Sequence, residues 1–538
     1  MKNDFFVIRN IKVPVCFESA QYHDESAIQK AKKKYSSKLE RKFGKADFFI
    51  YKKSVDARKT DEIFFIYSVA AKPENEIIAD LNYEDVSVVN SEYPEFDKIS
   101  VKQGERPVVV GFGPSGMFCS YVLALAGANP VIIERGDKIE DRTDKVKKYW
   151  ESGILDTESN VQFGEGGAGA FSDGKLLSRI NDKLTGYVLN KFVEFGAPKE
   201  ILYLSKPHVG TDLLKNVVRN MRNEIIKLGG SFMFNSKLTG INTYSDGSVK
   251  SVEINGNETL KSTAVFLCIG HSARDTFSML MEKGQTVTPK SFSVGVRIEH
   301  LQSDINRALY GKYADCVALE KAQYTLSHKE NGRAVYSFCM CPGGIVVASA
   351  SDNNEIVTNG MSYYKRDGIN ANSAIAVSVN ESDYGATPMG AIEYQRKIER
   401  SAYVLAGSDG ASPVQTLCDY MNSTVSHEPK RILPSYTGKT KICDINALFP
   451  DYINEMLKIG FCDFEMKIKG FSCSDAVLTA PETRTSSPVR INRNENCEAL
   501  KSKNLYPCGE GAGYAGGITS AAVDGIKCAI FYLKKISE

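Results

Sequence analysis

The chain has 538 residues, more than one hydrophobic core usually serves, so its length predicts about three domains. Its 67 basic and 65 acidic side chains nearly cancel, which argues against nucleic acid or an anionic membrane as a mainly electrostatic partner. Its first residues contain no apolar signal-peptide core, and its 13 cysteines follow no regular spacing. We therefore expect a cytoplasmic protein without structural disulfides.

The first 97 residues are expected to form a small α+β domain with a ferredoxin-like layout. Apolar patterning predicts strands over 5–15, 46–55 and 62–71, with a helix over 26–43. Residues 28–59 carry 12 basic and 3 acidic side chains, whereas residues 61–97 carry 10 acidic side chains and one lysine. Two interpretations remain for this polarity: a solvated surface whose charges compensate, or a docking patch for a protein partner. Residues 95–103 are expected to form a linker.

A glycine-rich turn follows the buried strand predicted over 108–110. Gly111 permits the tight turn, Gly113 lets the backbone approach a pyrophosphate, and Gly116 allows the next helix to pack on the strand. Glu134 ends a second apolar strand, where its carboxylate can accept hydrogen bonds from a ribose hydroxyl. Strand, glycines, helix and acidic residue together predict a dinucleotide-binding βαβ unit.

The rest of the chain divides into three stretches. Residues 183–229 carry helical periodicity, and 229–238 predict a turn and a strand that ends at Leu238. From 291 to 469, short strands alternate with helices such as 390–407, while 504–535 return to strand, glycine turn and helix. The predicted fold class is α/β. It comprises an N-terminal α+β domain (1–97), a Rossmann-like domain in two parts (104–290 and 470–538) and an inserted mixed α/β domain (291–469).

Four motifs, at 111–135, 161–176, 263–275 and 504–524, resemble those of flavoproteins of the glutathione-reductase structural type. Nearly the whole chain resembles the bacterial family of FAD-dependent dehydrogenases or NAD(P)/FAD-dependent oxidoreductases. The resemblance implies non-covalent FAD in the Rossmann-like domain and leaves the substrate open. The positions that we expect at the cofactor are Gly111, Gly113, Pro114, Ser115, Gly116, Glu134, Arg135, Gly166, Gly167, Ala168, Gly169, Leu238, Gly270, Gly509, Glu510, Gly517 and Ile518.

Several of these positions have a role implied by the resemblance. The small residues around Gly167 stand where related flavoproteins present a glycine pair to the flavin, and such a backbone suits a close approach. Glu510 stands where an acidic residue hydrogen-bonds the ribityl chain. Gly517 begins a helix whose first amides can face the pyrophosphate or the flavin.

Two features of related enzymes are missing from the sequence. Residues 161–176 contain no cysteine pair, so we do not expect thiol–disulfide chemistry beside the flavin. No second dinucleotide motif is present. NAD(P)H would therefore bind transiently in the flavin cleft, or electrons would come from another donor.

Cys339 and Cys341 form the pair of the sequence that most invites a chemical interpretation. Strand alternation would place both thiols on one face, and the following Pro-Gly-Gly turn could expose them. Three interpretations remain: ordinary strand residues, a reactive thiol near the flavin, or metal ligands. No matching second pair of ligands lies nearby, so no metal site is expected.

No residue can be given a catalytic role from the sequence, but further candidates exist. His271 could donate a proton or bind substrate, or be a structural histidine, and the same alternatives hold for His208. Arg484 and Arg490 could clamp an anionic substrate or form ion pairs. Arg297 is a further candidate for the cavity.

The sequence therefore predicts an FAD-dependent oxidoreductase of the dehydrogenase or reductase kind. Its unknown small-molecule substrate would lie between the nucleotide domain and the 291–469 domain, facing the flavin. The alternatives are a flavin-binding regulatory or interaction protein and a flavin monooxygenase.

Overall fold

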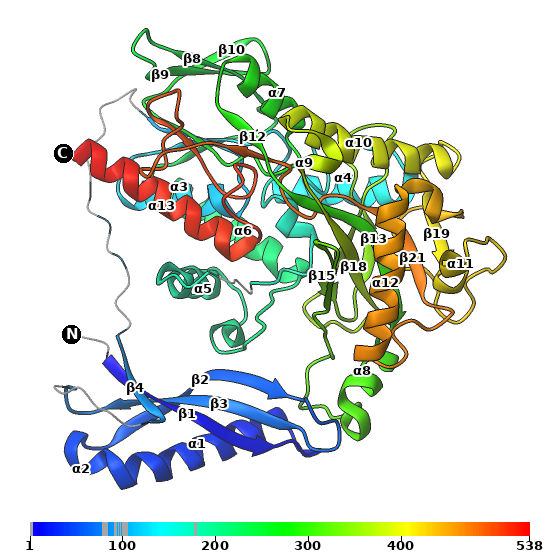
Figure 1. Ribbon diagram of the computed structural model, residues 1–538. Coiled ribbons are helices and arrows are strands. Elements are labelled where there is room, and N and C mark those ends of the chain that lie inside the picture. Colours follow the sequence, from blue (N-terminus) through cyan, green and yellow to red (C-terminus); the bar gives the residue numbers. More distant parts are fainter. Residues whose placement is uncertain are drawn as a thin grey trace.

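The computed structural model describes residues 4–77, 84–90, 94, 96, 98, 106–176 and 180–537. Its N-terminal domain is an antiparallel sheet of order β2-β3-β1-β4, and α1 and α2 cover the face turned away from the rest of the molecule (Figure 1). Its elements are β1 (Asp4–Pro14), α1 (Ala20–Lys38), α2 (Glu40–Phe43), β2 (Ala46–Asp56), β3 (Phe64–Pro73) and β4 (Val86–Asn90).

Helix α1 begins earlier than the sequence pattern predicts. The Ser19 side chain accepts a hydrogen bond from the Tyr22 amide and caps the helix, so the prediction of a start at residue 26 was wrong. The strand order is that of a ferredoxin-like sheet. Residues 74–77 and 84–85, between β3 and β4, form no second helix, and the predicted linker falls largely outside the described residues.

A parallel sheet of order β23-β11-β5-β6-β7 forms the second part of the molecule. Strands β5, β6, β11 and β23 are short and buried, because helices α3, α6 and α13 cover one face of the sheet and the β8–β10 meander with α7 covers the other. The C-terminal segment joins this sheet through β23, and α13 packs along α3. Gly525 of α13 permits this close packing, since a Cβ there would collide with the Ser115 carbonyl oxygen of α3.

The elements around the parallel sheet include an antiparallel meander, β8–β10, beside it. Their bounds are β5 (Val108–Val110), α3 (Pro114–Leu125), β6 (Val131–Ile133), α4 (Ile139–Ser152), η1 (Ala168–Phe171), α5 (Leu184–Glu194), η2 (Lys199–Leu202), α6 (Thr211–Lys227), β7 (Ser231–Met233), β8 (Leu238–Thr243), β9 (Val249–Ile254), β10 (Glu258–Lys261), β11 (Val265–Leu267), α7 (Arg274–Glu282), β23 (Leu505–Pro507) and α13 (Ile518–Ser537).

The third part is built on a sheet of order β14-β15-β18-β13-β21-β19-β20, with α12 packed on β15 and β18. Its elements are β13 (Phe292–Leu301), α8 (Gln302–Tyr310), η3 (Gly311–Tyr313), β14 (Ser327–Glu330), β15 (Arg333–Cys341), β18 (Asn370–Val379), α9 (Glu381–Tyr384), α10 (Pro388–Leu405), β19 (Ser412–Thr416), α11 (Leu417–Asn422), β20 (Thr440–Ile442), η4 (Ile445–Leu448), α12 (Asp451–Lys467) and β21 (Val477–Glu482).

Strand β21 corrects the predicted domain boundary at residue 469. It pairs with β13 and β19 and therefore belongs to this sheet, not to the C-terminal part of the nucleotide domain. Two smaller antiparallel strand pairs complete the fold. One pairs β12 (Val287–Pro289) with β22 (Val489–Ile491), where the chain crosses between the domains. The other pairs β16 (Ile345–Ala348) with β17 (Thr358–Met361).

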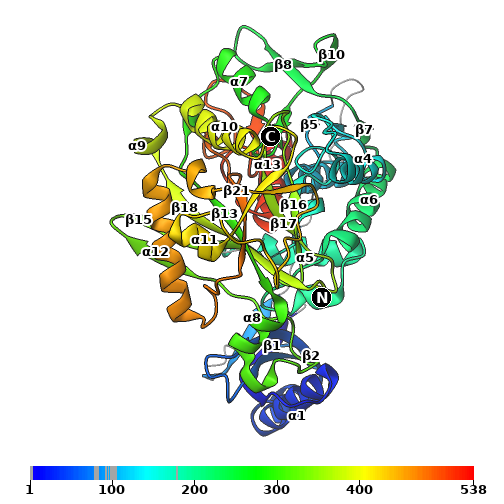
Figure 2. The ribbon, with the colours of Figure 1, turned by 90° about the vertical axis from the view of Figure 1, so that its right-hand side faces the viewer.

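The N-terminal domain shares its core with the third part. One continuous group of buried apolar side chains runs from the N-terminal sheet to β13 and α12, whereas the parallel sheet has separate cores. At the junction, the Cys316 thiol donates a hydrogen bond to the Cys16 carbonyl, and Phe17 stacks on Tyr313. Figure 2 shows this domain at one end of the molecule. None of the described helices combines the length and apolar character needed to cross a bilayer.

Candidate functional site

A cavity of about 410 Å³ lies where the parallel sheet meets the third part of the molecule. Its walls come from the carboxyl ends of β5, β6 and β11, from the start of α13, and from β15 and β17 of the other domain. Its size is that of a site for a small molecule or cofactor. The carboxyl ends of parallel strands are the usual position for such a site.

The turn after β5 contains glycine where no other residue fits. Gly111 has φ +92°, and a Cβ there would lie 2.5 Å from the Cys268 carbonyl oxygen. A Cβ on Gly116 would collide with the Gly111 carbonyl oxygen. The helix can therefore begin directly at Pro114, and its N-terminal end lines the cavity through Gly113, Pro114 and Ser115.

A second helix N-terminus reaches the same cavity. Gly516 and Gly517, just before α13, have open space where a Cβ would stand, and Gly517 and Ile518 line the cavity. The first amides of a helix have no partner within it, and its N-terminal end carries a partial positive charge. Two such ends facing one cavity suit the phosphates of a dinucleotide.

Glu134 ties the loops of this site together. Its carboxylate accepts hydrogen bonds from the Phe112 amide at 2.8 Å and from the Gly136 and Gly164 amides at 3.0 Å each. The side chain is buried and lines the cavity. Sequence reasoning assigned only a ribose contact to Glu134 and missed these three backbone contacts.

Arg142 supports the glycine-rich segment from the other side, a role that no sequence pattern indicated. Its guanidinium is fully buried and donates to five backbone carbonyl groups, those of residues 160, 161, 164, 165 and 167. Burial lowers its pKa to about 10. The segment 160–167 is thus shaped by one arginine of α4.

Further cofactor candidates divide into cavity walls and packing positions. Gly167, Ala168, Gly169, Leu238, Gly270 and Glu510 line the cavity. Gly116, Gly166 and Gly509 do not: the Gly166 amide donates to the Phe112 carbonyl, and Gly509 packs against Ser115. Arg135 lines the cavity while Glu158 and Asp275 hold its guanidinium, and Lys237 next to it was missed by sequence reasoning.

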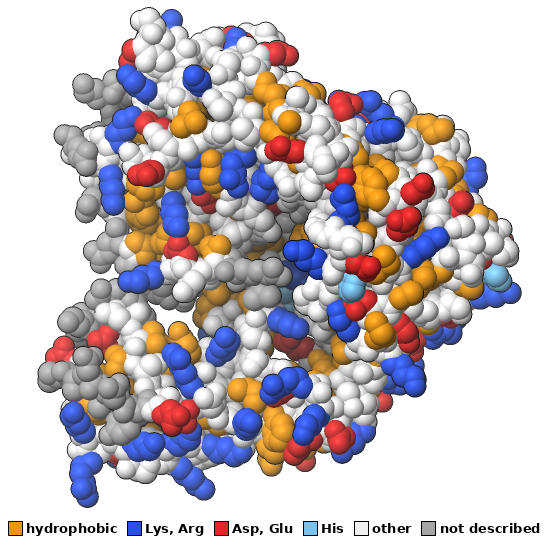
Figure 3. Space-filling view, viewed as in Figure 1, with side chains coloured by type: hydrophobic (Ala, Val, Ile, Leu, Met, Phe, Trp, Pro, Cys, Tyr) orange, Lys and Arg blue, Asp and Glu red, His pale blue; other side chains and the backbone are white. Residues whose placement is uncertain are grey.

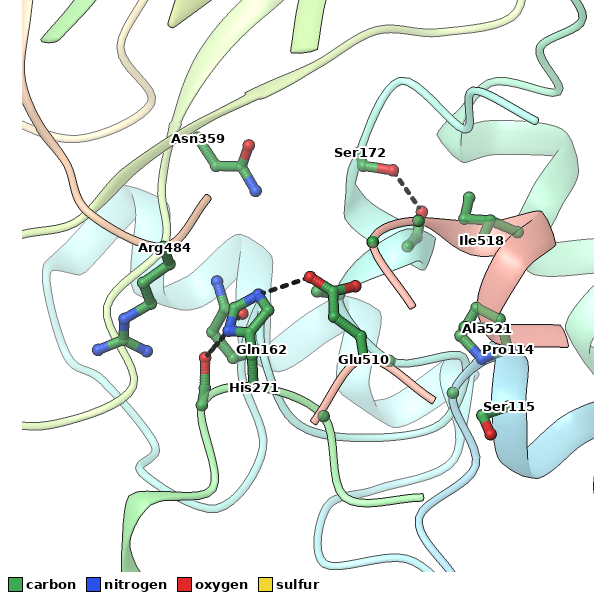
Figure 4. Close-up of a pocket in the computed structure, with 18 of the residues that line it drawn as sticks. Pro114, Ser115, Gln162, Ser172, His271, Asn359, Arg484, Glu510, Ile518 and Ala521 are labelled. Atoms are coloured by element: carbon green, nitrogen blue, oxygen red, sulfur yellow. Dashed lines mark hydrogen bonds and ion pairs between the residues drawn. The ribbon is translucent and has the colours of Figure 1, made fainter. Parts of the chain in front are cut away.

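His271 and Glu510 face each other inside the cavity (Figure 4). His271 Nε2 lies 3.8 Å from Glu510 Oε1, and His271 Nδ1 lies 2.9 Å from the Ser272 hydroxyl. That hydroxyl donates to Gln162 Oε1, and the Gln162 amide nitrogen donates to the Ser349 hydroxyl. This chain of hydrogen bonds assigns the His271 proton to Nδ1 and leaves Nε2 as an acceptor toward Glu510.

The two groups have opposite pKa shifts. Burial lowers the pKa of His271 to about 3, helped by the positive charges of Arg484 and Arg274, so its ring is neutral at pH 7. Burial raises the pKa of Glu510 to about 7, against a small effect of Lys290. The Glu510 carboxyl can therefore hold or release a proton at neutral pH.

The prediction that both thiols share one face of β15 was wrong. The ladder between β15 and β18 shifts register between Phe338 and Cys341, and Cys339 has φ +44°, as in a bulge. The Cys339 side chain is open to the cavity, whereas Cys341 is fully buried and its thiol donates to the Cys339 carbonyl. Desolvation inside the cavity raises the pKa of Cys339 to about 12, so the neutral thiol predominates. All 13 cysteines are free, and no described cluster of three or more His, Cys, Asp or Glu side chains is placed to hold a metal.

The remaining candidates have structural partners. Arg484 lines the cavity, but its guanidinium points away from His271 and pairs with buried Glu399 at 3.1 Å (Figure 4). Arg297 is not a cavity residue, because it is fully buried in an ion pair with Glu482 at 2.7 Å. His208 contacts the Tyr364 carbonyl away from the cavity, and Arg490 is exposed.

The far end of the cavity has polar groups that sequence reasoning missed. They are Asp173, Lys175, Lys206, Thr325 and Asn359. Asp173 and Lys175 lie within the motif at 161–176, which was the one signal available, whereas Lys206 and Asn359 belong to no motif.

The third part of the molecule matches a known family, and most of the chain aligns with a relative. Residues 291–485 match the family described as "FAD-dependent protein, C-terminal domain-like", which agrees with the inclusion of β21. An uncharacterized protein of Clostridium beijerinckii is 48% identical over 497 residues, which cover 90% of this chain and 92% of that protein. The chain belongs to this family of FAD-dependent proteins.

Solved structures with a looser likeness include several flavoproteins. The FrdA subunit of E. coli quinol fumarate reductase has a TM-score of 0.37 at 9% identity, over 80% of this chain and 70% of its own. The halogenase PltM, in complex with phloroglucinol and FAD, has a TM-score of 0.38 at 12% identity, over 80% and 69%. A geranylgeranyl bacteriochlorophyll reductase-like protein from Thermoplasma acidophilum has a TM-score of 0.33 at 12% identity, over 80% and 78%.

The residues of the cavity fit FAD. Two helix N-termini and the open space at Gly516 and Gly517 suit the pyrophosphate, while Glu134, Leu238 and Lys237 border the end where the adenosine would lie. The Glu510 carboxyl accepts no hydrogen bond from a described residue, so it is available to a ribityl hydroxyl.

Proposed function

We propose that this protein is an FAD-dependent oxidoreductase of the dehydrogenase or reductase kind, with a nucleotide domain of the glutathione-reductase type. The observation that carries the proposal is the His271–Glu510 pair, which stands between the dinucleotide motif and the walls of the third part of the molecule. FAD, when bound, supplies two-electron chemistry by accepting or giving a hydride.

The protein's own part in such a reaction is to handle the proton that the substrate loses or gains together with the hydride. His271 Nε2 is a hydrogen-bond acceptor directed into the cavity, so it can take a proton from a substrate hydroxyl or amine. With a pKa of about 3 the imidazole cannot keep that proton at pH 7. Glu510, 3.8 Å away and with a pKa of about 7, can store it, and the reverse path would serve a reduction.

A pH-dependent reduction of a general acceptor tests this proposal. The FAD-loaded protein is reduced anaerobically by light, by NADH or by NADPH and then mixed with menadione, which takes up a hydride and a proton. We expect the rate of menadione reduction to fall above about pH 7 in the native protein, because Glu510 then loses its proton. Glu510→Gln should be slower and should lose this titration.

His271→Asn should slow menadione reduction, whereas His427→Asn is the matched control because His427 is an exposed histidine on a surface loop. A pH-independent rate in the native protein, or equal rates in both histidine variants, would overturn the proton path. Binding of a partner that follows the flavin redox state without any turnover would favour an interaction protein instead. Substrate hydroxylation coupled to oxygen consumption would favour a monooxygenase.

A further inference from the structure

One lysine at the far end of the cavity has no counter-ion. Lys206 lines the cavity, and no described residue accepts a hydrogen bond from it or lies within 4 Å as an ion-pair partner. Lys206 is exposed, unlike Arg297 and Arg484, whose buried guanidinium groups pair with Glu482 and Glu399. A cation that is left open to a cavity is available to a ligand.

The nearby acidic groups do not neutralise it. Asp173 accepts from Arg366 and lies 3.2 Å from Lys175, so its charge is already shared by two cations. Glu320 acts on Lys206 through space, but no ion pair within 4 Å joins them. Partial desolvation at the cavity wall, with the positive charges of Lys175 and Arg366, lowers the pKa of Lys206.

The segment that carries Lys206 is fixed at both ends. On one side the Lys53 amide of β2 donates to the Tyr203 carbonyl at 2.7 Å, and the Ser205 amide donates to the Lys53 carbonyl at 2.9 Å. On the other side the Leu176 amide donates to the Pro207 carbonyl at 2.9 Å. The edge of the N-terminal sheet and Leu176 thus hold the backbone on both sides of Lys206, which lowers the entropic cost of binding an anion.

The surface that lines the cavity as a whole is apolar for the greater part. Tyr324, Phe338 and Met340 line the cavity from the third part of the molecule, with Thr325 as a polar neighbour. On the outside, a hollow separates the N-terminal domain from the rest of the molecule, and Lys and Arg side chains lie along its edges (Figure 3). A positively charged border of this kind favours the approach of anions.

We infer that the substrate is an organic carboxylate with an apolar body, whose carboxylate pairs with Lys206 while its other end faces His271. This inference rests on the proposed oxidoreductase function, since it names the substrate class of the same cavity. It also gives the N-terminal domain a role: its β2 edge holds the segment that recognises the anion.

Calorimetric titration of the FAD-loaded protein with benzoate and with benzamide tests the inference, because the two probes share shape and differ in charge. We expect benzoate to bind at least about tenfold more tightly than benzamide. Lys206→Met should weaken benzoate binding by about tenfold or more and leave benzamide within about twofold, while Lys206→Arg should retain most of the preference. Lys321→Met is the control, since Lys321 is exposed and outside the cavity.

The inference would be overturned by any one of three results. These are equal binding of the two probes by the native protein, no binding of either probe, and unchanged benzoate binding by Lys206→Met. The measurement reports binding and not turnover, so the two proposals fail separately. Lys206-dependent benzoate binding in a protein that reduces no acceptor would remove only the oxidoreductase proposal. Turnover of an acceptor by a protein that binds benzoate and benzamide equally would overturn only the inference that the substrate is a carboxylate.

Discussion

A Cβ on Gly167 would lie 3.0 Å from the Cα of Gly113, so two glycine turns from distant parts of the chain touch through their backbones. One turn precedes α3 and the other belongs to the segment held by Arg142. A side chain at Gly167 would push the two turns apart, whereas a Cβ on Gly113 would lie 3.6 Å from the Cα of Gly167, an ordinary contact. The close approach of the two turns at the dinucleotide motif therefore depends on the absence of a Cβ at Gly167.

Gly167→Ala should lower FAD affinity by about tenfold or more, because the new methyl group presses on Gly113 and the φ of +61° disfavours alanine. Gly284→Ala is a matched control: Gly284 has φ +76°, but no atom lies within 4 Å of the point that its Cβ would occupy. The control should lose about 1 kcal/mol of stability and keep its FAD affinity. Fluorescence titration with FAD measures both, and equal affinity losses would disprove the contact's role.

Glu134→Ala should destabilise the protein even without cofactor, because three backbone amides lose their acceptor. Each buried amide left unpaired costs about 1–3 kcal/mol. We expect a clear drop in the melting temperature of the apoprotein as well as weaker FAD binding. Glu158→Gln, which changes a half-exposed ion pair, should have little effect. An unchanged melting temperature of the Glu134→Ala apoprotein would show that Glu134 contributes only a contact to the ribose.

Cys339 should react slowly with iodoacetamide although its side chain is open to the cavity. With its pKa raised to about 12, the thiolate is scarce at pH 8, and the rate should rise about tenfold per pH unit up to pH 10. Cys462, an exposed cysteine of α12, should be modified first. Peptide mass spectrometry follows both sites, and labelling of Cys339 as fast as Cys462 at pH 7.5 would support a reactive thiol. Cys339→Ser should retain FAD.

Acid should destabilise the protein through His300, which is fully buried and contacts the Phe471 carbonyl. Burial lowers its folded-state pKa to about 4, below the ordinary 6.5. Between these values only the unfolded chain binds the proton, so stability is lost as the pH falls from about 6.5 to about 4, by up to about 3 kcal/mol.

Urea unfolding at pH 7.5 and pH 4.5 measures this loss. His300→Gln removes the titrating group and keeps a donor for the Phe471 carbonyl, so its loss of stability between the two pH values should be smaller than that of the native protein. The same loss in both proteins would exclude His300 as a source of acid sensitivity.

The parts of the site that could be predicted are those with a local steric cause. Gly111 and Gly116 are required by their own turn and helix, and Glu134 by its place at the end of β6, so short-range sequence patterns reveal them. Arg142 and Lys206 could not be predicted, because their roles depend on segments that meet only in the folded chain. The bulge at Cys339 also breaks the strand alternation that a prediction from sequence assumes.

The fold, like the site, could be predicted from the sequence only where its cause is local. The βαβ unit and the return of the chain through β23 match local patterns of strand, glycine turn and helix. Strand β21 is buried along its whole length, so its sequence cannot say which of two sheets it joins, and the domain boundary was misplaced for that reason.

The core shared by the N-terminal domain and the third part of the molecule has a consequence for unfolding. Side chains such as Tyr67 and Tyr310 belong to the same apolar group, so neither part can be taken out of the fold without uncovering the other. On heating, these two regions of the sequence should melt in one cooperative step, although the nucleotide domain separates them along the chain. Removal of the N-terminal residues would then act as a core mutation of the third part, and loss of solubility would be its first sign.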